Sequence, residues 1–503
     1  MRSEPPAMAN GLPRALLIVI AVTTLVRLAL AGLLDLGADE SYALAVSVPL
    51  QLSFFDHPPL AFWIAGVMQA LFGRDIAPML LRLPFILMFA GSTWAMFALT
   101  RRFYGERAGV WAAGLLNTAP FFFLSAGSWV VPDGPLVLAL LLAALCFAKA
   151  LDADGGAWRY WLGTGLFAGL ALLSKYQAIV VIAGALLVLA MPAYRRWLRT
   201  AQPYVAVVLA AVLFGPVLWW NVQNDWVSVA FQLGRGNGAT HHDPLRALTV
   251  FTGEAIYLLP WLLVGLVVAA IRARGAGAHL FLPLALPLIV LFNVLALVAP
   301  GLPHWAMPGW LFLFPPLGRL LADAAGRGRR WPLWFAGASA TTLGALLLVA
   351  VLTVSNSRVV AGNPGLDGAL AEATSWTGVY DGLTANGLLN RPGTFLAAMD
   401  WLTGARLAEA TRTEAPVVVF GNDPRGFAFL GDPNAHLGED AIIVAPAGRA
   451  SAVEALARDH FTGLDIVGSF TTSKGGHPAF AETAWLARNF KTPVALRYGP
   501  WAR

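Results

Sequence analysis

The sequence contains few charged residues and only one cysteine. Charged residues make up 12% of the 503 positions, whereas apolar residues make up 58%. Soluble globular proteins are about half apolar and about a quarter charged, so this composition excludes a protein that folds entirely in water. The single cysteine, Cys146, cannot form an intrachain disulfide, which excludes a small disulfide-stabilised scaffold.

The excess of basic over acidic residues is small and does not indicate a nucleic-acid partner. The chain has 34 basic and 28 acidic residues, a net charge of +6. The arginines lie in short segments between long apolar runs, which is where membrane proteins place cytoplasmic basic residues. Residues 355–503 have instead the mixed composition of a soluble domain. The sequence therefore predicts a polytopic helical membrane protein, with a membrane domain at 1–354 and a soluble domain at 355–503.

Eleven apolar runs have the length of membrane-spanning helices, for which a hydrocarbon core of roughly 30 Å requires about 20 residues. The first run exceeds the length of a signal-peptide core and is expected to remain as an anchor. The apolar stretch Pro58–Phe72 is shorter, opens with two prolines and is predicted to be an interfacial helix. The eleven predicted spans are 12–34, 76–100, 108–126, 134–151, 159–174, 176–193, 202–220, 247–271, 279–299, 305–323 and 331–354.

The basic clusters all fall on one side when the N-terminus is placed in the cytoplasm. This orientation follows the positive-inside rule and puts residues 355–503 on the extracytoplasmic side. In that domain, short apolar runs such as Ala441–Val444 alternate with helical patterns such as Ser451–Arg458, which predicts a small α/β fold. The clustered arginines are Arg101, Arg102, Arg107, Arg195, Arg196, Arg199, Arg272, Arg274, Arg327, Arg329 and Arg330.

Two adjacent carboxylates, Asp39 and Glu40, follow the first predicted span on the extracytoplasmic side. Carboxylates at a membrane surface are costly to desolvate and indicate function by default. One of them could be a general base, which must lie within hydrogen-bond reach of the proton that it removes. The alternative is structural, because Asp39 could simply cap the following helix.

The other polar candidates lie on the same predicted side. Lys175 could pair with a lipid headgroup, with Asp133 or with a substrate phosphate. Neighbouring His241 and His242 could contribute to a metal site, but no further ligand spacing supports one, so no metal is predicted to be required and a divalent metal is only possible. The candidate binding residues are His57, Asp133, Lys175, His241, His242, Arg246 and His304.

The order of these motifs resembles the GT-C class of membrane glycosyltransferases. The motifs are Asp39-Glu40 after the first span, Pro58-Pro59-Leu60 before an aromatic-bearing helix, Pro132-Asp133, Leu173-Ser174-Lys175 and His304-Trp305. Over roughly 1–320 the chain is similar to bacterial members of the protein-mannosyltransferase-like group, glycosyltransferase family 39. This group includes relatives of the lipid A aminoarabinose transferase and the rhizobial galacturonosyltransferases.

The resemblance implies a multi-pass protein of the bacterial inner membrane that transfers a sugar from a polyprenyl phosphate to a hydroxyl of a lipid, glycan or protein. It implies that Asp39 deprotonates the acceptor, that Glu40 positions Asp39 or the substrate, and that the anomeric carbon is inverted. Cations such as Lys175 and His57 would stabilise the leaving phosphate. Many relatives carry Lys where this chain has His57, and histidine is mostly neutral near pH 7. This difference weakens the transfer of individual phosphate contacts.

Two other functions fit a membrane protein of this composition. A transporter or flippase for lipid-linked sugars would usually show internal repeats and charges buried at mid-span. The main charges within the predicted spans are Arg27 and Arg82, and no repeat of fixed period is present. A non-catalytic scaffold for residues 355–503 would leave the polar extracytoplasmic loops unexplained. The sequence therefore favours a glycosyltransferase.

Overall fold

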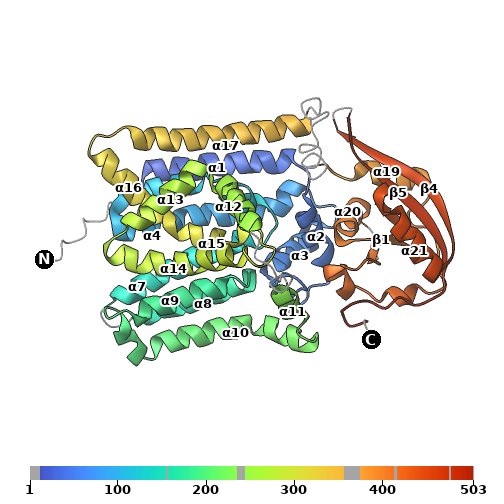
Figure 1. Cartoon of the computed structure of the whole chain (residues 1–503), viewed down its shortest axis with the longest axis horizontal. Helices are drawn as coiled ribbons and strands as arrows, with labels where there is room; N and C mark the ends of the chain where they lie inside the picture. The colour runs from blue at the N-terminus through green and yellow to red at the C-terminus, as the bar shows by residue number, and fades with distance from the viewer. Residues whose placement is uncertain are drawn as a thin grey trace.

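The computed structural model describes residues 12–153, 157–234, 244–355, 374–412, 416–474 and 477–501. Figure 1 shows a bundle of long helices at one end and a sheet-containing domain at the other. Two short helices, α2 (Ala38–Val46) and α3 (Leu60–Phe72), lie where these parts meet. The predicted fold class, a helical membrane protein with a small C-terminal α/β domain, is confirmed.

Long apolar helices form the bundle, and many of their aliphatic side chains point outward. Leu25 of α1 is 65% exposed and Leu333 of α17 is 65% exposed, as expected where lipid replaces water. The main helices are α1 (Arg14–Leu33), α4 (Pro78–Leu116), α7 (Asp133–Asp152), α8 (Trp158–Ser174), α9 (Ala178–Ala190), α10 (Gln202–Gln223), α12 (Pro244–Leu258), α13 (Pro260–Arg272), α14 (Gly275–Leu295), α16 (Phe314–Gly326) and α17 (Trp331–Ser355). Shorter connecting helices are α5 (Pro120–Phe123), α6 (Ser125–Ser128), α11 (Val227–Gly234) and α15 (Met307–Trp310).

Helix α4 is two helices that fold back on each other at Gly105. This glycine has φ 84° and ψ 171°, a conformation that is accessible only at a high cost to other residues. The Asn117 side chain donates to the Thr93 hydroxyl at 3.0 Å, and these two residues lie at equal distances along the chain from Gly105. The sequence predicted the two separate spans 76–100 and 108–126 on either side of this turn.

Within the described residues, six helices are long and apolar enough to cross a membrane, or seven if α12 and α13 form one broken span. These two helices meet at an angle of 97°. Leu259 lies at the break with φ 72°, and Pro260 begins α13. The remaining predicted spans, such as 159–174 and 176–193, contain helices that are shorter or interrupted. The total of eleven spans therefore stays a prediction.

The basic loops gather at one end of the bundle. Arg102 forms an ion pair with Asp152 at 2.6 Å, and Arg196 donates to the Leu151 carbonyl at 3.3 Å. At the same end, the Arg319 guanidinium lies 5.2 Å from the Tyr104 ring and donates to the Arg274 carbonyl at 3.4 Å. Figure 1 shows this end of the bundle, with the α16–α17 connection, opposite the C-terminal domain.

The C-terminal domain contains a five-stranded sheet in its described part, with the order β2-β1-β3-β5-β4. The first three strands are parallel, and β5 is antiparallel to both β3 and β4. Helices α19 (Thr377–Ala385) and α20 (Trp401–Thr411) share a core with α2 and α3, whereas α21 (Ala450–His460) packs on the other side of the sheet. The strands are β1 (Thr394–Ala398), β2 (Val418–Val419), β3 (Asp440–Pro446), β4 (Phe461–Lys474) and β5 (His477–Phe490).

This arrangement makes α2 and α3 the connection between bundle and domain. The predicted interfacial helix Pro58–Phe72 corresponds to α3, for which Pro59 is the N-cap. Helix α17 ends at Ser355, and the division of the chain into domains at 354/355 stays a prediction.

The domain contains a buried carboxyl group, Glu482 on β5, that makes its stability depend on pH. Burial, with a smaller contribution from Asp400, raises the pKa of Glu482 from 4.5 to about 8. The unfolded chain releases this proton at a lower pH than the folded chain, so stability falls as pH rises from about 4.5 to about 8. We expect Glu482→Gln to raise the thermal midpoint at pH 8 and to leave it unchanged at pH 4. Tryptophan fluorescence of the full chain in detergent measures both midpoints; equal shifts at both pH values would contradict this assignment.

Candidate active site

Asp39 lies in the first turn of α2, immediately after α1. Gly37 precedes this helix in an extended conformation, and its amide donates to the Glu40 carboxylate at 2.9 Å. The Asp39 side chain is exposed, whereas that of Glu40 is buried. Asp39 is therefore an exposed carboxylate in the first turn of a helix, next to a buried one.

Glu40 forms a buried ion pair with Arg82 of α4. The Arg82 Nε donates to Glu40 Oε1 at 2.8 Å, and Nη2 donates to Oε2. The Val130 amide also donates to Oε1, at 3.1 Å. Burial alone would raise the pKa of Glu40, but the charge and hydrogen bonds of Arg82, together with the two backbone amides, outweigh burial and lower it.

This network changes the interpretation of Glu40. Both of its oxygens already accept two hydrogen bonds each within the protein. A carboxylate held in this way is a poor proton acceptor but fixes the helix that carries it. We therefore interpret Glu40 as a positioning residue for Asp39. The sequence reasoning placed Arg82 within a span without connecting it to Glu40, although an arginine in an apolar run requires a partner.

A second buried ion pair joins α7 and α8. Lys175, the C-cap residue of α8, donates from Nζ to the two Asp133 carboxylate oxygens at 2.8 and 3.0 Å. Asp133 is the first residue of α7, and both side chains are at most 7% exposed. Of the partners considered for Lys175, the structure shows Asp133. An ammonium has three N–H donors, so this geometry leaves one donor for a ligand.

His57 and His304 lie within electrostatic range of this pair. Asp133 interacts with the charges of Lys175, His304 and His57, which come from separate segments of the chain. Tyr257, near the end of α12, interacts with both Asp133 and Asp39. The structure thus places three of the predicted residues within electrostatic range of Asp133, and both Asp133 and Asp39 within range of Tyr257, which the sequence reasoning missed. The predicted residues in this group are Asp39, His57, Asp133, Lys175 and His304.

The other three predicted binding residues are His241, His242 and Arg246, and the structure does not place them with this group. His241 and His242 lie outside the described residues. Arg246 lies in α12 at the opposite end from Tyr257, about three helical turns away along the same helix. Within the residues that the structure describes, no three His, Cys, Asp or Glu side chains are grouped to hold a metal ion. The absence of a metal requirement stays a prediction.

The C-terminal domain contacts the segment that carries His57. The Tyr42 hydroxyl of α2 donates to Asp56 Oδ1 at 3.0 Å and accepts from the Gly426 amide at 2.9 Å. The Arg425 guanidinium lies 3.8 Å from Asp56 Oδ2 and stacks 3.7 Å from the Trp401 ring centre. Asp56 and Tyr42 are buried, so this contact fixes the loop before α3 against both α2 and the domain.

Sequence comparisons identify two glycosyltransferase relatives. The family described as dolichyl-phosphate-mannose-protein mannosyltransferase matches residues 56–220. The lipid A galacturonosyltransferase RgtD of Rhizobium johnstonii is 26% identical over 315 residues, which cover 59% of this chain and 64% of that protein. The undecaprenyl phosphate-alpha-4-amino-4-deoxy-L-arabinose arabinosyl transferase 2 of Proteus mirabilis is 24% identical over 323 residues. That match covers 61% of this chain and 56% of the relative, so less than two thirds of either relative is spanned.

The fold resembles solved structures over nearly the whole chain. ArnT from Cupriavidus metallidurans, in the structure bound to undecaprenyl phosphate, has a TM-score of 0.63 at 15% identity. The match covers 95% of this chain and 99% of ArnT. The chain is therefore similar in sequence to these glycosyltransferases over part of its length, and it shares the fold of ArnT.

Proposed function

We propose that the protein transfers a sugar from a polyprenyl phosphate to a hydroxyl of a lipid acceptor at the extracytoplasmic face of the bacterial inner membrane. The observation that carries this proposal is the Asp133–Lys175 pair, with two histidines within electrostatic range of Asp133, and Asp39 and Asp133 both within range of Tyr257. A lipid acceptor is favoured over a glycan or protein because one relative is named as a lipid A transferase. No cofactor or nucleotide sugar is required by this reaction.

In the proposed reaction, Asp39 removes the proton from the acceptor hydroxyl. The hydroxyl oxygen attacks the anomeric carbon from the side opposite the phosphate, and a new glycosidic bond forms. The bond between the anomeric carbon and the phosphate oxygen breaks, and polyprenyl phosphate leaves with the electron pair. One displacement inverts the anomeric centre. Asp39 is suited to this role because its side chain is exposed in the first turn of α2, where an acceptor hydroxyl could come within hydrogen-bond reach.

In this proposal, Lys175, His57 and His304 stabilise the leaving phosphate. Negative charge develops on the phosphate as the bond breaks, and fixed donors placed there stabilise the transition state. Lys175 is held in place by Asp133 and presents one further N–H donor. His57 and His304 lie within electrostatic range of Asp133 in the same pair. In this interpretation Asp133 orients Lys175.

The side of the membrane on which the candidate site lies is inferred from the distribution of arginine. The basic loops occupy the end of the bundle opposite the C-terminal domain. Basic loops stay in the cytoplasm, so the domain and the candidate site are assigned to the extracytoplasmic side and the N-terminus to the cytoplasm. The domain contacts the loop that carries His57, which is consistent with one shared compartment.

We expect Lys175→Met to raise the KM for the polyprenyl-phosphate sugar by about tenfold or more, because a hydrogen bond to a charged group contributes about 1.5–3 kcal/mol. The variant also leaves Asp133 buried without its cation, which lowers stability. The double variant Asp133→Asn/Lys175→Met separates the two effects. It should regain thermal stability but keep the high KM. Recovery of both properties would show that Lys175 has only a structural role.

A strain that lacks the chain tests the function itself. Mass spectrometry of membrane extracts, with and without restoration of the gene, follows both polyprenyl-phosphate sugars and envelope lipids. We expect the strain without the chain to accumulate one intact lipid-linked sugar and to lose one sugar-sized mass from a lipid. A lipid-linked sugar that accumulates on the cytoplasmic side only would favour the flippase alternative instead.

A further inference from the structure

One peptide unit, between Leu36 and Gly37, is held at both of its polar ends just before α2 begins. Its carbonyl oxygen, on Leu36, accepts a hydrogen bond at 2.5 Å from Nη1 of Arg406, a residue of α20 in the C-terminal domain. Its amide, on Gly37, donates to the Glu40 carboxylate at 2.9 Å. Because a peptide unit is planar, these two hydrogen bonds together fix the orientation of the whole unit.

The two hydrogen bonds come from different parts of the molecule. Glu40 is bound to Arg82 of α4, in the bundle, and Arg82 also donates to the carbonyls of Leu34 and Asp35 at 2.7 and 2.8 Å. Arg406 belongs to the C-terminal domain and is 4% exposed. Three consecutive carbonyls before α2 are thus held by buried guanidinium groups, two by the bundle and one by the domain.

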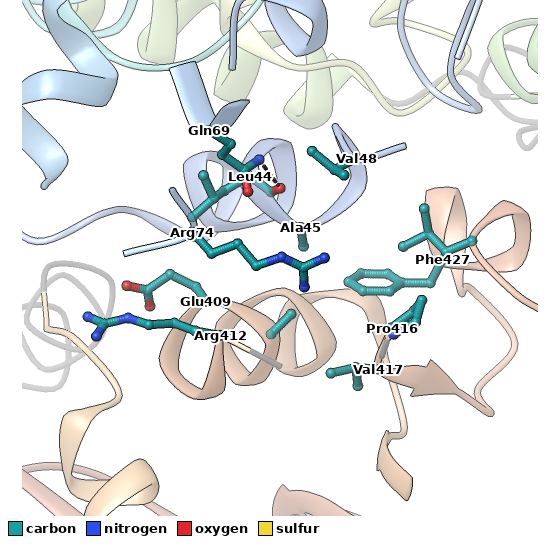
Figure 2. A pocket seen from close by; sticks show the side chains of 12 residues that line it. Leu44, Ala45, Val48, Gln69, Arg74, Glu409, Arg412, Pro416, Val417 and Phe427 are labelled. Atoms are coloured by element: carbon teal, nitrogen blue, oxygen red, sulfur yellow. Dashed lines mark hydrogen bonds between the residues drawn. The ribbon is translucent and has the colours of Figure 1, made fainter. Parts of the chain in front are cut away.

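Further contacts dock the domain on the same segment. The Ser375 amide donates to Asp35 Oδ2 at 3.0 Å. The Leu36 side chain is buried in the apolar core that α2 shares with α19 and α20. Figure 2 shows the continuation of this contact, where α2, with Ala45, runs beside α20, with Glu409. The domain therefore packs against both α2 and the residues that lead into it.

The charges of α20 lie close to the acidic start of α2. Glu409, one turn after Arg406, interacts with the charges of Arg406 and Arg412 on its own helix and with those of Asp35 and Glu40 across the contact. Replacing Arg406 alone leaves Glu409 with one cation fewer beside two other carboxylates. A variant that also replaces Glu409 removes this imbalance.

We propose that Arg406 is a positioning residue for Asp39, and that the C-terminal domain thereby aligns the general base. Asp39 follows Gly37 by two residues, in the first turn of α2. Gly37 has no Cβ to restrict its backbone, so the direction of α2 depends on the hydrogen bonds that hold this peptide unit. A misplacement of about 1 Å in a catalytic site can lower a rate by about 100-fold. This inference rests on the proposed function, in which Asp39 accepts the proton of the acceptor.

Initial-rate kinetics of Arg406→Gln in detergent test the proposal. We expect kcat to fall by about tenfold to 100-fold with the KM for the polyprenyl-phosphate sugar unchanged, because only the alignment of the base is lost. Arg412→Gln is the matched control, since Arg412 lies on the same helix in an ion pair with Asp75 that is at least half exposed. Its kcat should equal that of wild type. An unchanged kcat in Arg406→Gln, with or without a higher KM, would overturn the proposal.

A double variant shows whether Arg406 acts through Asp39. If it does, Arg406→Gln should change the residual rate of Asp39→Asn by less than about twofold, because the base that it aligns is already lost. A loss by the same factor in both backgrounds would overturn the proposal and leave Arg406 a purely structural role. If Arg406→Gln does not fold, Arg406→Gln/Glu409→Gln takes its place in each measurement, because it removes both charges.

Hydrogen exchange of the full chain gives a readout that does not depend on sugar transfer. We expect the amides of residues 37–42 to exchange about tenfold faster in Arg406→Gln than in wild type, while those of α21, on the other side of the sheet, stay unchanged. Unchanged exchange at residues 37–42 would overturn the positioning role. If Arg406→Gln accelerates this exchange but wild type transfers no sugar, the proposed function is wrong although Arg406 holds the start of α2.

Discussion

Asp39→Asn is expected to lower the rate of sugar transfer by about 100-fold to 10,000-fold, the usual contribution of a general base. The amide has nearly the same shape as the carboxylate but cannot accept the acceptor proton. Asp39 is exposed and Glu40 holds its helix, so the substitution should not change the fold. The donor should still bind, because the groups assigned to its phosphate are on other segments.

The measurement for Asp39→Asn is initial-rate kinetics in detergent with a labelled polyprenyl-phosphate sugar. The loss should appear in kcat, with the KM for the donor changed little. Asp152→Asn is the control, because Asp152 is a half-exposed carboxylate that pairs with Arg102 at the opposite end of the bundle. Asp39 is not the base if Asp39→Asn retains more than about a tenth of the wild-type kcat.

Glu40→Gln is expected to lower the free energy of unfolding by about 3–5 kcal/mol. This is the cost of leaving the other member of a buried ion pair, here Arg82, without its opposite charge. Arg82 would keep the carbonyls of Leu34 and Asp35, at 2.7 and 2.8 Å, but no buried carboxylate. Loss of this pair also releases α2 from α4, so transfer should fall with stability. Thermal unfolding of the full chain and the transfer rate below the midpoint measure both effects.

A double variant distinguishes positioning from direct catalysis by Glu40. Glu40→Gln/Arg82→Gln removes both charges, and replacing a whole buried pair costs less than breaking it. We expect this variant to be more stable than Glu40→Gln. By contrast, the exposed pair Arg102–Asp152 should contribute about 0–1 kcal/mol when either member is replaced. A Glu40→Gln protein of normal stability that has lost transfer would assign Glu40 a direct catalytic role.

The sequence predicted the architecture where one physical effect dominated. Long apolar runs can be satisfied only as helices in a membrane, which is why α1, α7, α10 and α17 lie where the composition placed them. The sequence analysis did not predict the break at Leu259, because the apolar run 247–271 was taken as one span, although Pro260 within it is a signal for a helix break. The pairing of the soluble strands was equally inaccessible, since it depends on contacts between distant segments.

The sequence predicted several residues of the candidate site but not the contacts between them. Asp39, Asp133 and Lys175 were selected because polar groups beside apolar runs require a reason. Tyr257 was missed because a tyrosine near the end of an apolar helix is ordinary in a membrane protein. The sequence analysis noted Arg82 but did not identify Glu40 as its ion-pair partner. The two residues are 42 positions apart in the chain, and only the fold brings them together.

Transfer by the purified chain in proteoliposomes tests the central claim most directly. The vesicles contain the full chain, a polyprenyl-phosphate sugar labelled in the sugar, and a lipid A acceptor, without nucleotide. We predict that the label moves to the acceptor, that free polyprenyl phosphate appears in equal amount, and that Asp39→Asn stops both. If the labelled lipid instead crosses the bilayer intact and no acceptor is labelled, the protein is a flippase and the account is wrong.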